Sequence, residues 1–208
     1  MEGPVSDLRI VVASGAQERL AEAIVARRYA WRGYRDELAP MAYLTLIAMS
    51  GRWPVGTITL GMDSPAGLLA DGNYRAEIDA VRSRGGRACE LVRFAVESPR
   101  GRGGVESKRI LAAGVQAIVA LCEDMQMTDV LVEVNPRHVG YYRRALGFEV
   151  FGPPRRCARA SAPSVLMRRC LGVENHDVGS FTGDGWGDHP RNQFPCDRAD
   201  GMDHARDR

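Results

Sequence analysis

The sequence predicts one mixed α/β domain, in which helices flank a central sheet that is largely antiparallel. Short runs rich in β-branched and aromatic residues alternate with longer segments whose apolar residues recur at helical spacing. The apolar share of the chain is 45%, enough for a substantial core. The order strand, helix, two strands, helix, strand, helix, strand, helix, strand fits one sheet with helices packed on it, and no segment repeats.

Each element is expected from its pattern and from the residues that end it. We expect strands at residues 8–13, 41–49, 55–60, 89–97, 129–134, 148–151 and 165–169, and helices at 17–34, 74–82, 105–125 and 137–146. A turn at residues 50–52 makes a hairpin of the second and third strands, and residues 63–71 form a long, turn-rich excursion. Gly85-Gly86 closes the second helix and Gly147 the last. Pro136 stops the strand before it, because proline cannot continue a central ladder.

The last part of the chain differs in composition from the rest. Residues 172–208 are rich in Gly, Asp, Pro and Arg and have few aliphatic residues, so they cannot bury enough surface to offset the entropy of ordering. We expect a folded domain over residues 1–171 and a disordered acidic tail over 172–208. The net charge of the chain is +2; the tail holds eight acids against four Lys or Arg, so the body carries +6.

Composition also limits the class of function. A mildly basic body fits an acidic partner or a phosphorylated ligand, but it is too weak to indicate nucleic-acid binding. The five cysteines have no C-x-x-C pair and no His cluster nearby, so we expect reduced thiols, no metal site and a cytoplasmic protein. No apolar run approaches the roughly 20 residues of a membrane span, and the N-terminus lacks a secretion signal.

The strand at 89–97 carries two opposite charges in an apolar run. On a regular strand Glu90 shares a face with Val92, Phe94 and Val96, whereas Arg93 points to the other face. Such charges are costly in a core unless they are paired or used. A structural ion pair, a sheet edge and a catalytic pair all remain open.

Two further segments have both an ordinary and a functional interpretation. The end of the first helix is crowded with Arg28, Trp31 and Arg32. It is either a solvated basic end or a gate over a hydrophobic ligand, with an arginine binding a carboxylate or phosphate. The glycines of residues 98–104 form either a flexible connection or a cradle of backbone N–H groups for an anion.

Several motifs together resemble known families. Glu90-Leu91-Val92-Arg93-Phe94-Ala95-Val96 resembles the E-x-x-R-F-A-V strand of acyl-homoserine-lactone synthases, and the order of elements is similar to the GNAT N-acyltransferase fold. The resemblance to long-chain N-acyl amino acid synthases is more specific and covers roughly residues 7–171. It rests on residues 56–60, 63–65, 67–71, 74, 77–79 and 135–138.

The resemblance implies transfer of a fatty acyl group from the thioester of an acyl carrier protein to the α-amine of an amino acid, with tyrosine as the prototype acceptor. The donor is then the carrier's acyl-phosphopantetheine, and no tightly bound cofactor is expected. Glu90 is the candidate base for the ammonium group. Arg93 is expected to orient Glu90 or the substrate carboxylate. A β-bulge would expose strand N–H groups near Phe94, Ala95 and Val96 to the oxyanion and bring the two charges together.

Further contacts are carried over from the same resemblance. Tyr142 looks like the tyrosine that protonates the leaving thiolate, although it lies five residues before Gly147 where four is usual, and Tyr141 competes with it. His138 is either a substrate contact or proton relay, or part of the packing at a helix start. The expected substrate-binding residues are Arg28, Trp31, Arg32, Phe94, Ala95, Val96, Asn135, His138 and Tyr141.

The glycine-rich loop bears on the donor. Ser98-Pro99-Arg100-Gly101-Arg102-Gly103 has the glycines of coenzyme A-binding loops, but Ser stands first and Pro99 removes an N–H group. Phosphopantetheine on a carrier protein needs less of a pyrophosphate site than coenzyme A does. We expect contact with the carrier or its phosphopantetheine by Arg100, Arg102, Gly103, Lys108 and Arg109; a solvated basic patch is the other interpretation.

Three alternative functions stay open. One is an acyl-homoserine-lactone synthase that uses S-adenosylmethionine, and a second is an acetyl-coenzyme A-dependent acetyltransferase. The third is a catalytically silent acyl-binding module, favoured if Glu90 is locked in a core ion pair. Cys89 adjoins Glu90, but no partner base is visible for a thiol nucleophile, so direct transfer is preferred.

Overall fold

The computed structural model describes residues 8–36, 42–97 and 103–171. The predicted tail at 172–208 lies outside the described residues. Within them, eight strands form the sheet, in the order β1-β2-β3-β4-β5-β8-β6, with β7 paired to β8. The strands are β1 (Leu8–Val12), β2 (Tyr43–Ser50), β3 (Trp53–Met62), β4 (Ala88–Val96), β5 (Asp129–Val134), β6 (Glu149–Val150), β7 (Arg155–Cys157) and β8 (Ala162–Cys170).

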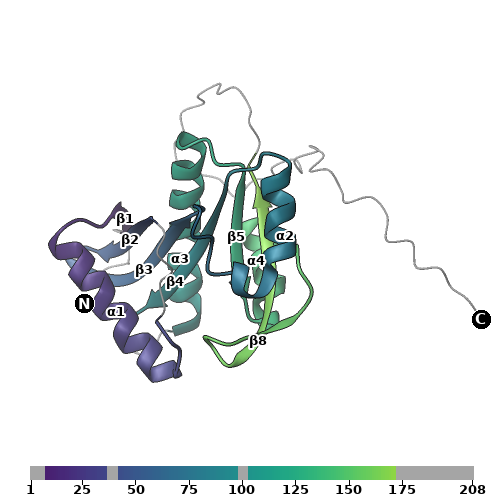
Figure 1. Ribbon diagram of the computed structural model, residues 1–208. Helices are drawn as coiled ribbons and strands as arrows, with labels where there is room; N and C mark the ends of the chain where they lie inside the picture. The colour runs from purple at the N-terminus through teal and green to yellow at the C-terminus, as the bar shows by residue number, and fades with distance from the viewer. Residues whose placement is uncertain (1–7, 37–41, 98–102, 172–208) are drawn as a thin grey trace, which may run out of the picture. The chain divides into compact units, whose positions relative to one another are not determined.

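The sheet is mixed and largely antiparallel, as predicted. Among the described strands, β4 and β5 are the parallel pair, and the other neighbours run antiparallel (Figure 1). The crossover between β4 and β5 is α3, because parallel neighbours cannot be joined by a tight turn.

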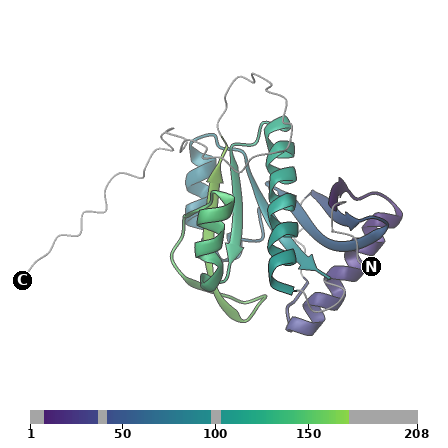
Figure 2. The ribbon, with the colours of Figure 1, turned by 180° about the vertical axis from the view of Figure 1, so that it is seen from behind.

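Helices cover both faces of the sheet. The helical segments are α1 (Ala16–Arg32), α2 (Asp71–Ser83), α3 (Gly103–Asp124), the 3-10 turn η1 (Pro136–His138) and α4 (Val139–Leu146). The helices α1 and α2 lie on one face, and α3 and α4 lie on the other, which is in front in Figure 2. No helix of the described part is long and apolar enough to cross a membrane.

The periodicity in the sequence explains which side of each helix is buried. In α2, Tyr74, Ile78 and Val81 recur every three to four residues and pack against Leu131 and Leu166 of the sheet. The opposite face of the sheet is covered by the apolar stripe of α3, which belongs to the largest core cluster. Burial of these stripes, worth about 25 cal/mol per Å² of apolar surface, holds the layers together.

Two differences from the predicted elements have local causes. The helix α2 begins at Asp71, before the predicted start at residue 74, because Tyr74 has non-helical dihedrals and divides an initial turn from the regular helix. The strand β7 was not predicted: three residues are too few to show an alternation. Cys89, Cys122 and Cys157 are free thiols, as expected.

Candidate active site

The site begins where two parallel strands separate. The pairing of β4 with β5 runs only from Ala88–Asp129 to Leu91–Val132. Both strands continue beyond that point, to Val96 and Val134, but they no longer pair with each other. A cavity of about 440 Å³ lies there, lined by residues of β4, β5, the end of α1, η1, α4 and the β7–β8 turn. This size lies within the range of small-molecule sites.

The expected bulge is present in β4. Thr59 pairs with Val92, but Thr57 pairs with Ala95, so β4 has one residue more than β3 over this stretch. Arg93 takes up the irregularity with a φ of 52°, a left-handed value that is rare for a residue other than glycine. The bulge breaks the alternation of faces, and Glu90 and Arg93 both line the cavity.

The bulged part of β4 also presents backbone donors. Glu97 donates its N–H to the carbonyl of Val55 on β3 at 2.9 Å. Because successive N–H groups on a strand point to opposite sides, the N–H of Val96 points away from β3, toward the side that β5 has left. Phe94 and Val96 line the cavity. Ala95 instead packs against Ile24 and Val25 of α1.

Glu90 is not locked in a core ion pair. Its side chain is 1% exposed, and its Oε2 accepts the backbone N–H of Ala70 at 3.0 Å. Among the described residues it has no salt bridge. Burial raises the pKa of Glu90 to about 7, against the lowering effect of the Ala70 N–H and the positive charge of Arg159. A carboxyl group with this pKa exchanges a proton readily near neutral pH.

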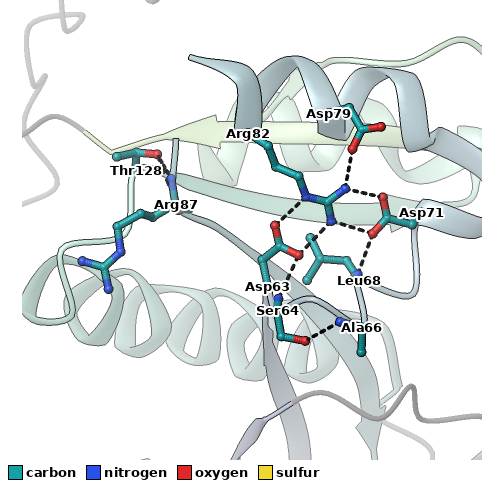
Figure 3. Close-up of polar contacts among 9 residues, drawn as sticks. All are labelled: Asp63, Ser64, Ala66, Leu68, Asp71, Asp79, Arg82, Arg87 and Thr128. Carbon is teal, nitrogen blue, oxygen red and sulfur yellow. Dashed lines mark hydrogen bonds and ion pairs between the residues drawn. The ribbon is translucent and has the colours of Figure 1, made fainter. Parts of the chain in front are cut away.

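The loop that donates to Glu90 is fixed by Arg82 (Figure 3). The Arg82 guanidinium binds Asp63 through Nε and Nη2, Asp71 through Nη1 and Nη2, and Asp79 through Nη1, at 2.6–2.8 Å. Asp71 Oδ2 in turn accepts the N–H of Leu68 at 2.6 Å. The sequence gives no sign of this hub, because its carboxylates lie at different distances along the chain.

One glycine in this loop is required by its geometry. Gly67 has a φ of +80°, and a Cβ there would lie 2.6 Å from Asp71 Oδ2. The Arg82 network and Gly67 therefore hold residues 63–71 in one conformation, and this conformation sets the Ala70 N–H against Glu90.

Arg93 does not hold Glu90. Its Nη2 donates to Asp36 at 2.9 Å, and its buried Nε has no hydrogen-bond partner. Its side chain is 11% exposed. The contact with Glu90 expected from the sequence is therefore not formed, and the buried unpaired Nε costs about 1–3 kcal/mol.

Sequence reasoning missed several charged residues of the cavity, among them Glu133 and Arg159. Arg159 Nη2 donates to Glu133 Oε2 at 2.7 Å, and Glu133 Oε1 accepts from Asn73 at 2.8 Å and Ser164 at 2.6 Å. Glu133 is a charge inside an apolar run, the same signal that singled out Glu90. Arg159 lies in a turn and gives no signal in the sequence.

The end of α1 forms one wall of the cavity. Arg28 and Arg32 line it, as does Tyr29. Trp31 does not line it: this side chain is 68% exposed, with the guanidinium carbons of Arg28 and Arg32 at 4.8 and 5.0 Å from its ring centroid. Of the three residues expected at this end of the helix, the two arginines line the cavity and the tryptophan does not.

The two tyrosines of α4 have different positions. Tyr142 is buried, lines the cavity, and has its pKa raised by burial, so its hydroxyl keeps its proton at neutral pH. Tyr141 does not line the cavity; its hydroxyl donates to the carbonyl of Lys108 at 2.9 Å. Of the two tyrosines, Tyr142 is therefore the one that lines the cavity.

The short turn before α4 contributes polar lining. Asn135 and His138 line the cavity, and the Asn135 side chain accepts the N–H of Arg137. Arg137 Nε donates to His138 Nε2 at 3.1 Å. Burial and the charges of Arg137 and Arg32 lower the pKa of His138, so the imidazole is neutral at pH 7.

The residues expected to meet a carrier protein are only partly described. Arg100 and Arg102 lie outside the described residues. Gly103 is the first residue of α3, and Lys108 and Arg109 are exposed on that helix. The Lys108 ammonium lies 5.7 Å from the ring centroid of Tyr141. No cluster of three or more His, Cys, Asp and Glu suited to a metal ion occurs in the part of the chain that the structure describes.

Comparison with solved structures defines the class of protein. FeeM, an N-acyl amino acid synthase from uncultured soil microbes, has a TM-score of 0.66 at 22% identity, over 78% of this chain and 90% of that chain. The coenzyme A-dependent acyl-homoserine lactone synthase BjaI has a TM-score of 0.52 at 18% identity, over 80% and 83%. An N-acetyltransferase-like protein from Lactobacillus plantarum has a TM-score of 0.52 at 17% identity, over 79% and 98%. The fold is therefore that of GNAT-like N-acyltransferases.

The sequence identifies the family within this class. The family model described as N-acyl amino acid synthase FeeM matches residues 21–170, which is more than half of the chain. The chain belongs to the FeeM family of N-acyl amino acid synthases, and it is an acyltransferase. No curated protein sequence matches it.

Proposed function

We propose that this enzyme transfers a long-chain fatty acyl group from the thioester of an acyl carrier protein to the α-amine of an amino acid. The observation that carries the proposal is the position of Glu90, a buried carboxyl group without an ion-pair partner among the described residues, at the point where β4 and β5 separate. A general base with a pKa of about 7 is matched to neutral pH.

The reaction needs three events, and each has a candidate group in the cavity. Glu90 takes a proton from the acceptor's ammonium group, directly or through a water. The free amine attacks the thioester carbonyl carbon, and the N–H of Val96 stabilises the oxyanion that forms. The carbon–sulfur bond then breaks, and Tyr142 donates a proton to the leaving thiolate. As the amide forms, the second proton of the amine nitrogen passes through water to the Tyr142 phenolate and restores the tyrosine, and Glu90 releases the first proton to solvent.

The choice of donor rests on the sequence of the loop at 98–103. BjaI is described as coenzyme A-dependent, so coenzyme A is the alternative donor within this fold. Pro99 and the leading Ser98 weaken a pyrophosphate cradle. The exposed basic residues Lys108 and Arg109 of α3 suit the acidic surface of a carrier protein. These features favour the carrier protein as donor.

The experiment that tests the proposal compares donors and acceptors directly. The purified enzyme is incubated with lauroyl-acyl carrier protein or lauroyl-coenzyme A, with tyrosine or S-adenosylmethionine as acceptor, and the products are identified by mass spectrometry. We expect N-lauroyl tyrosine from the carrier-protein donor, and at least tenfold less from coenzyme A. Formation of a homoserine lactone instead, or of no amide with any pair, would overturn the proposal.

A further inference from the structure

Arg159 is fixed at the cavity from two directions. It lies in the turn between β7 and β8, where its carbonyl accepts the N–H of Arg35 at 3.0 Å. Its Nη2 donates to Glu133 at 2.7 Å. The Arg159 side chain remains 23% exposed, whereas that of Glu133 is 5% exposed. The guanidinium is thus anchored by Glu133, and Arg159 lines the cavity.

Glu133 anchors Arg159 without using up its donors. Both Glu133 oxygens are occupied, Oε2 by Arg159 and Oε1 by Asn73 and Ser164. A guanidinium has five N–H donors in a planar fork, and Glu133 takes one of them. A second is engaged in a hydrogen bond with the Cys157 side chain. The donors that remain are suited to a planar anion such as a carboxylate.

Arg159 also lies close enough to Glu90 for each to influence the other. The charge of Arg159 lowers the pKa of Glu90, and the charge of Glu90 raises the pKa of Arg159. An α-amino acid carries its ammonium and carboxylate groups on the same carbon. If the ammonium group is at Glu90, the carboxylate therefore has to be bound by a neighbouring cation.

The other cations of the cavity are less suited to this role. Arg93 is paired with Asp36 and offers Nε alone as a buried unsatisfied donor. Arg28 and Arg32 stack on Trp31 at the end of α1. Arg137, which donates its Nε to His138, also lines the cavity, as does Arg35. Among these cations, Arg159 has a guanidinium anchored by the buried Glu133 and lies near Glu90.

We propose that Arg159, anchored by Glu133, binds the α-carboxylate of the acceptor and so selects α-amino acids over amines that lack a carboxylate. This inference rests on the proposed function. It assigns specificity to a residue that neither the motifs nor the strand pattern singled out, and it gives Glu133 the role of a positioning residue.

The test compares acceptors that differ only in the carboxylate. Initial rates with lauroyl-acyl carrier protein are measured for tyrosine, tyrosinamide and tyramine, in the wild type, Arg159→Gln and Arg159→Lys. Arg156→Gln, on the exposed side of the same hairpin, is the matched control. Circular dichroism melting curves verify that each variant is folded.

We expect the wild type and Arg156→Gln to prefer tyrosine strongly. Arg159→Gln should lower kcat/KM for tyrosine about 10- to 150-fold, the loss expected for a hydrogen bond to a charged group. It should leave tyrosinamide and tyramine within threefold of the wild type, so that the preference for the carboxylate disappears. Arg159→Lys keeps the charge without the fork and should lose about tenfold for tyrosine alone. This second variant provides the same readout if Arg159→Gln does not fold.

Two results would overturn the inference and are distinguishable from each other. If Arg159→Gln or Arg159→Lys slows all three acceptors equally, or none of them, Arg159 does not bind the carboxylate, and the proposed function is unaffected. If the wild type acylates none of the acceptors from either donor, the proposed function fails and this inference fails with it.

Discussion

The two halves of β4 differ in how they are held. Residues 89–91 are paired on both sides, with β3 and with β5, and are buried. Residues 92–96 are bonded to β3 alone, contain a bulge, and border the cavity. Glu90 lies at the end of the rigid half, next to the open one. One strand thus supplies both a fixed base and unpaired backbone donors, because its pairing with β5 ends at Leu91 whereas its pairing with β3 continues to Val96.

The largest effect is expected when the base in the paired half of β4, Glu90, is replaced. Glu90→Gln keeps an acceptor for the Ala70 N–H but cannot take a proton. We expect kcat to fall by about 10²–10⁴-fold, the usual contribution of general-base catalysis, with an unchanged circular dichroism spectrum. Single-turnover kinetics with lauroyl-acyl carrier protein measures the chemical step. Near-full turnover in this variant would remove Glu90 from the mechanism.

The hydrogen bond from the Ala70 N–H to Glu90 is tested by removing the Arg82 contacts that hold the loop at residues 63–71. Arg82→Gln breaks the bonds to Asp63, Asp71 and Asp79 and should cost about 1–3 kcal/mol of stability, a discounted value because Arg82 is 27% exposed. Looser contact with the Ala70 N–H raises the pKa of Glu90 further. The acid limb of the pH–rate profile should therefore move to higher pH, with activity recovering at alkaline pH.

The matched control for this variant is Arg87→Gln. The Arg87 side chain is exposed. The residue is bonded to Thr128 through its backbone, whose N–H donates to the Thr128 hydroxyl (Figure 3) and whose carbonyl accepts the Thr128 N–H. It should keep the wild-type pH profile. An Arg82→Gln variant that is merely slower at every pH, with an unmoved acid limb, would show that Arg82 supports the fold but not the base.

The desolvation of the Glu90 carboxylate should have a smaller effect, which is on the stability of the protein. Its pKa rises from 4.5 in the unfolded chain to about 7 in the fold. The neutral form of Glu90 is therefore favoured in the folded protein. Its contribution to the free energy of unfolding is fully present below pH 4.5 and is lost as the pH rises through 7. A shift of this size corresponds to about 3 kcal/mol at most. Glu90→Gln should thus melt higher than the wild type at pH 8 by an amount that vanishes at pH 4.5. An equal difference at both pH values would contradict the burial argument.

The sequence predicted the strands and the helix that carry the site better than it predicted the charged side chains within and around the cavity. Periodicity located the strands at 89–97 and 129–134 and the helix at 105–125, because each buries a continuous apolar face. The resemblance to the family led to the bulge and to Glu90. Arg82 was not predicted because its partners lie 3, 11 and 19 residues away. Arg159 was not predicted because its contact with Glu133 spans 26 residues and joins a turn to a strand.

The most direct test of the account is the pH dependence of kcat/KM for the wild-type enzyme at low acceptor concentration, with Glu90→Gln in parallel. The account predicts that log kcat/KM rises with a slope of one on the acid side and bends near pH 7, where Glu90 loses its proton, and that Glu90→Gln lacks this bend. A bend near pH 4.5 in the wild type, or the same bend near pH 7 in both proteins, would contradict it.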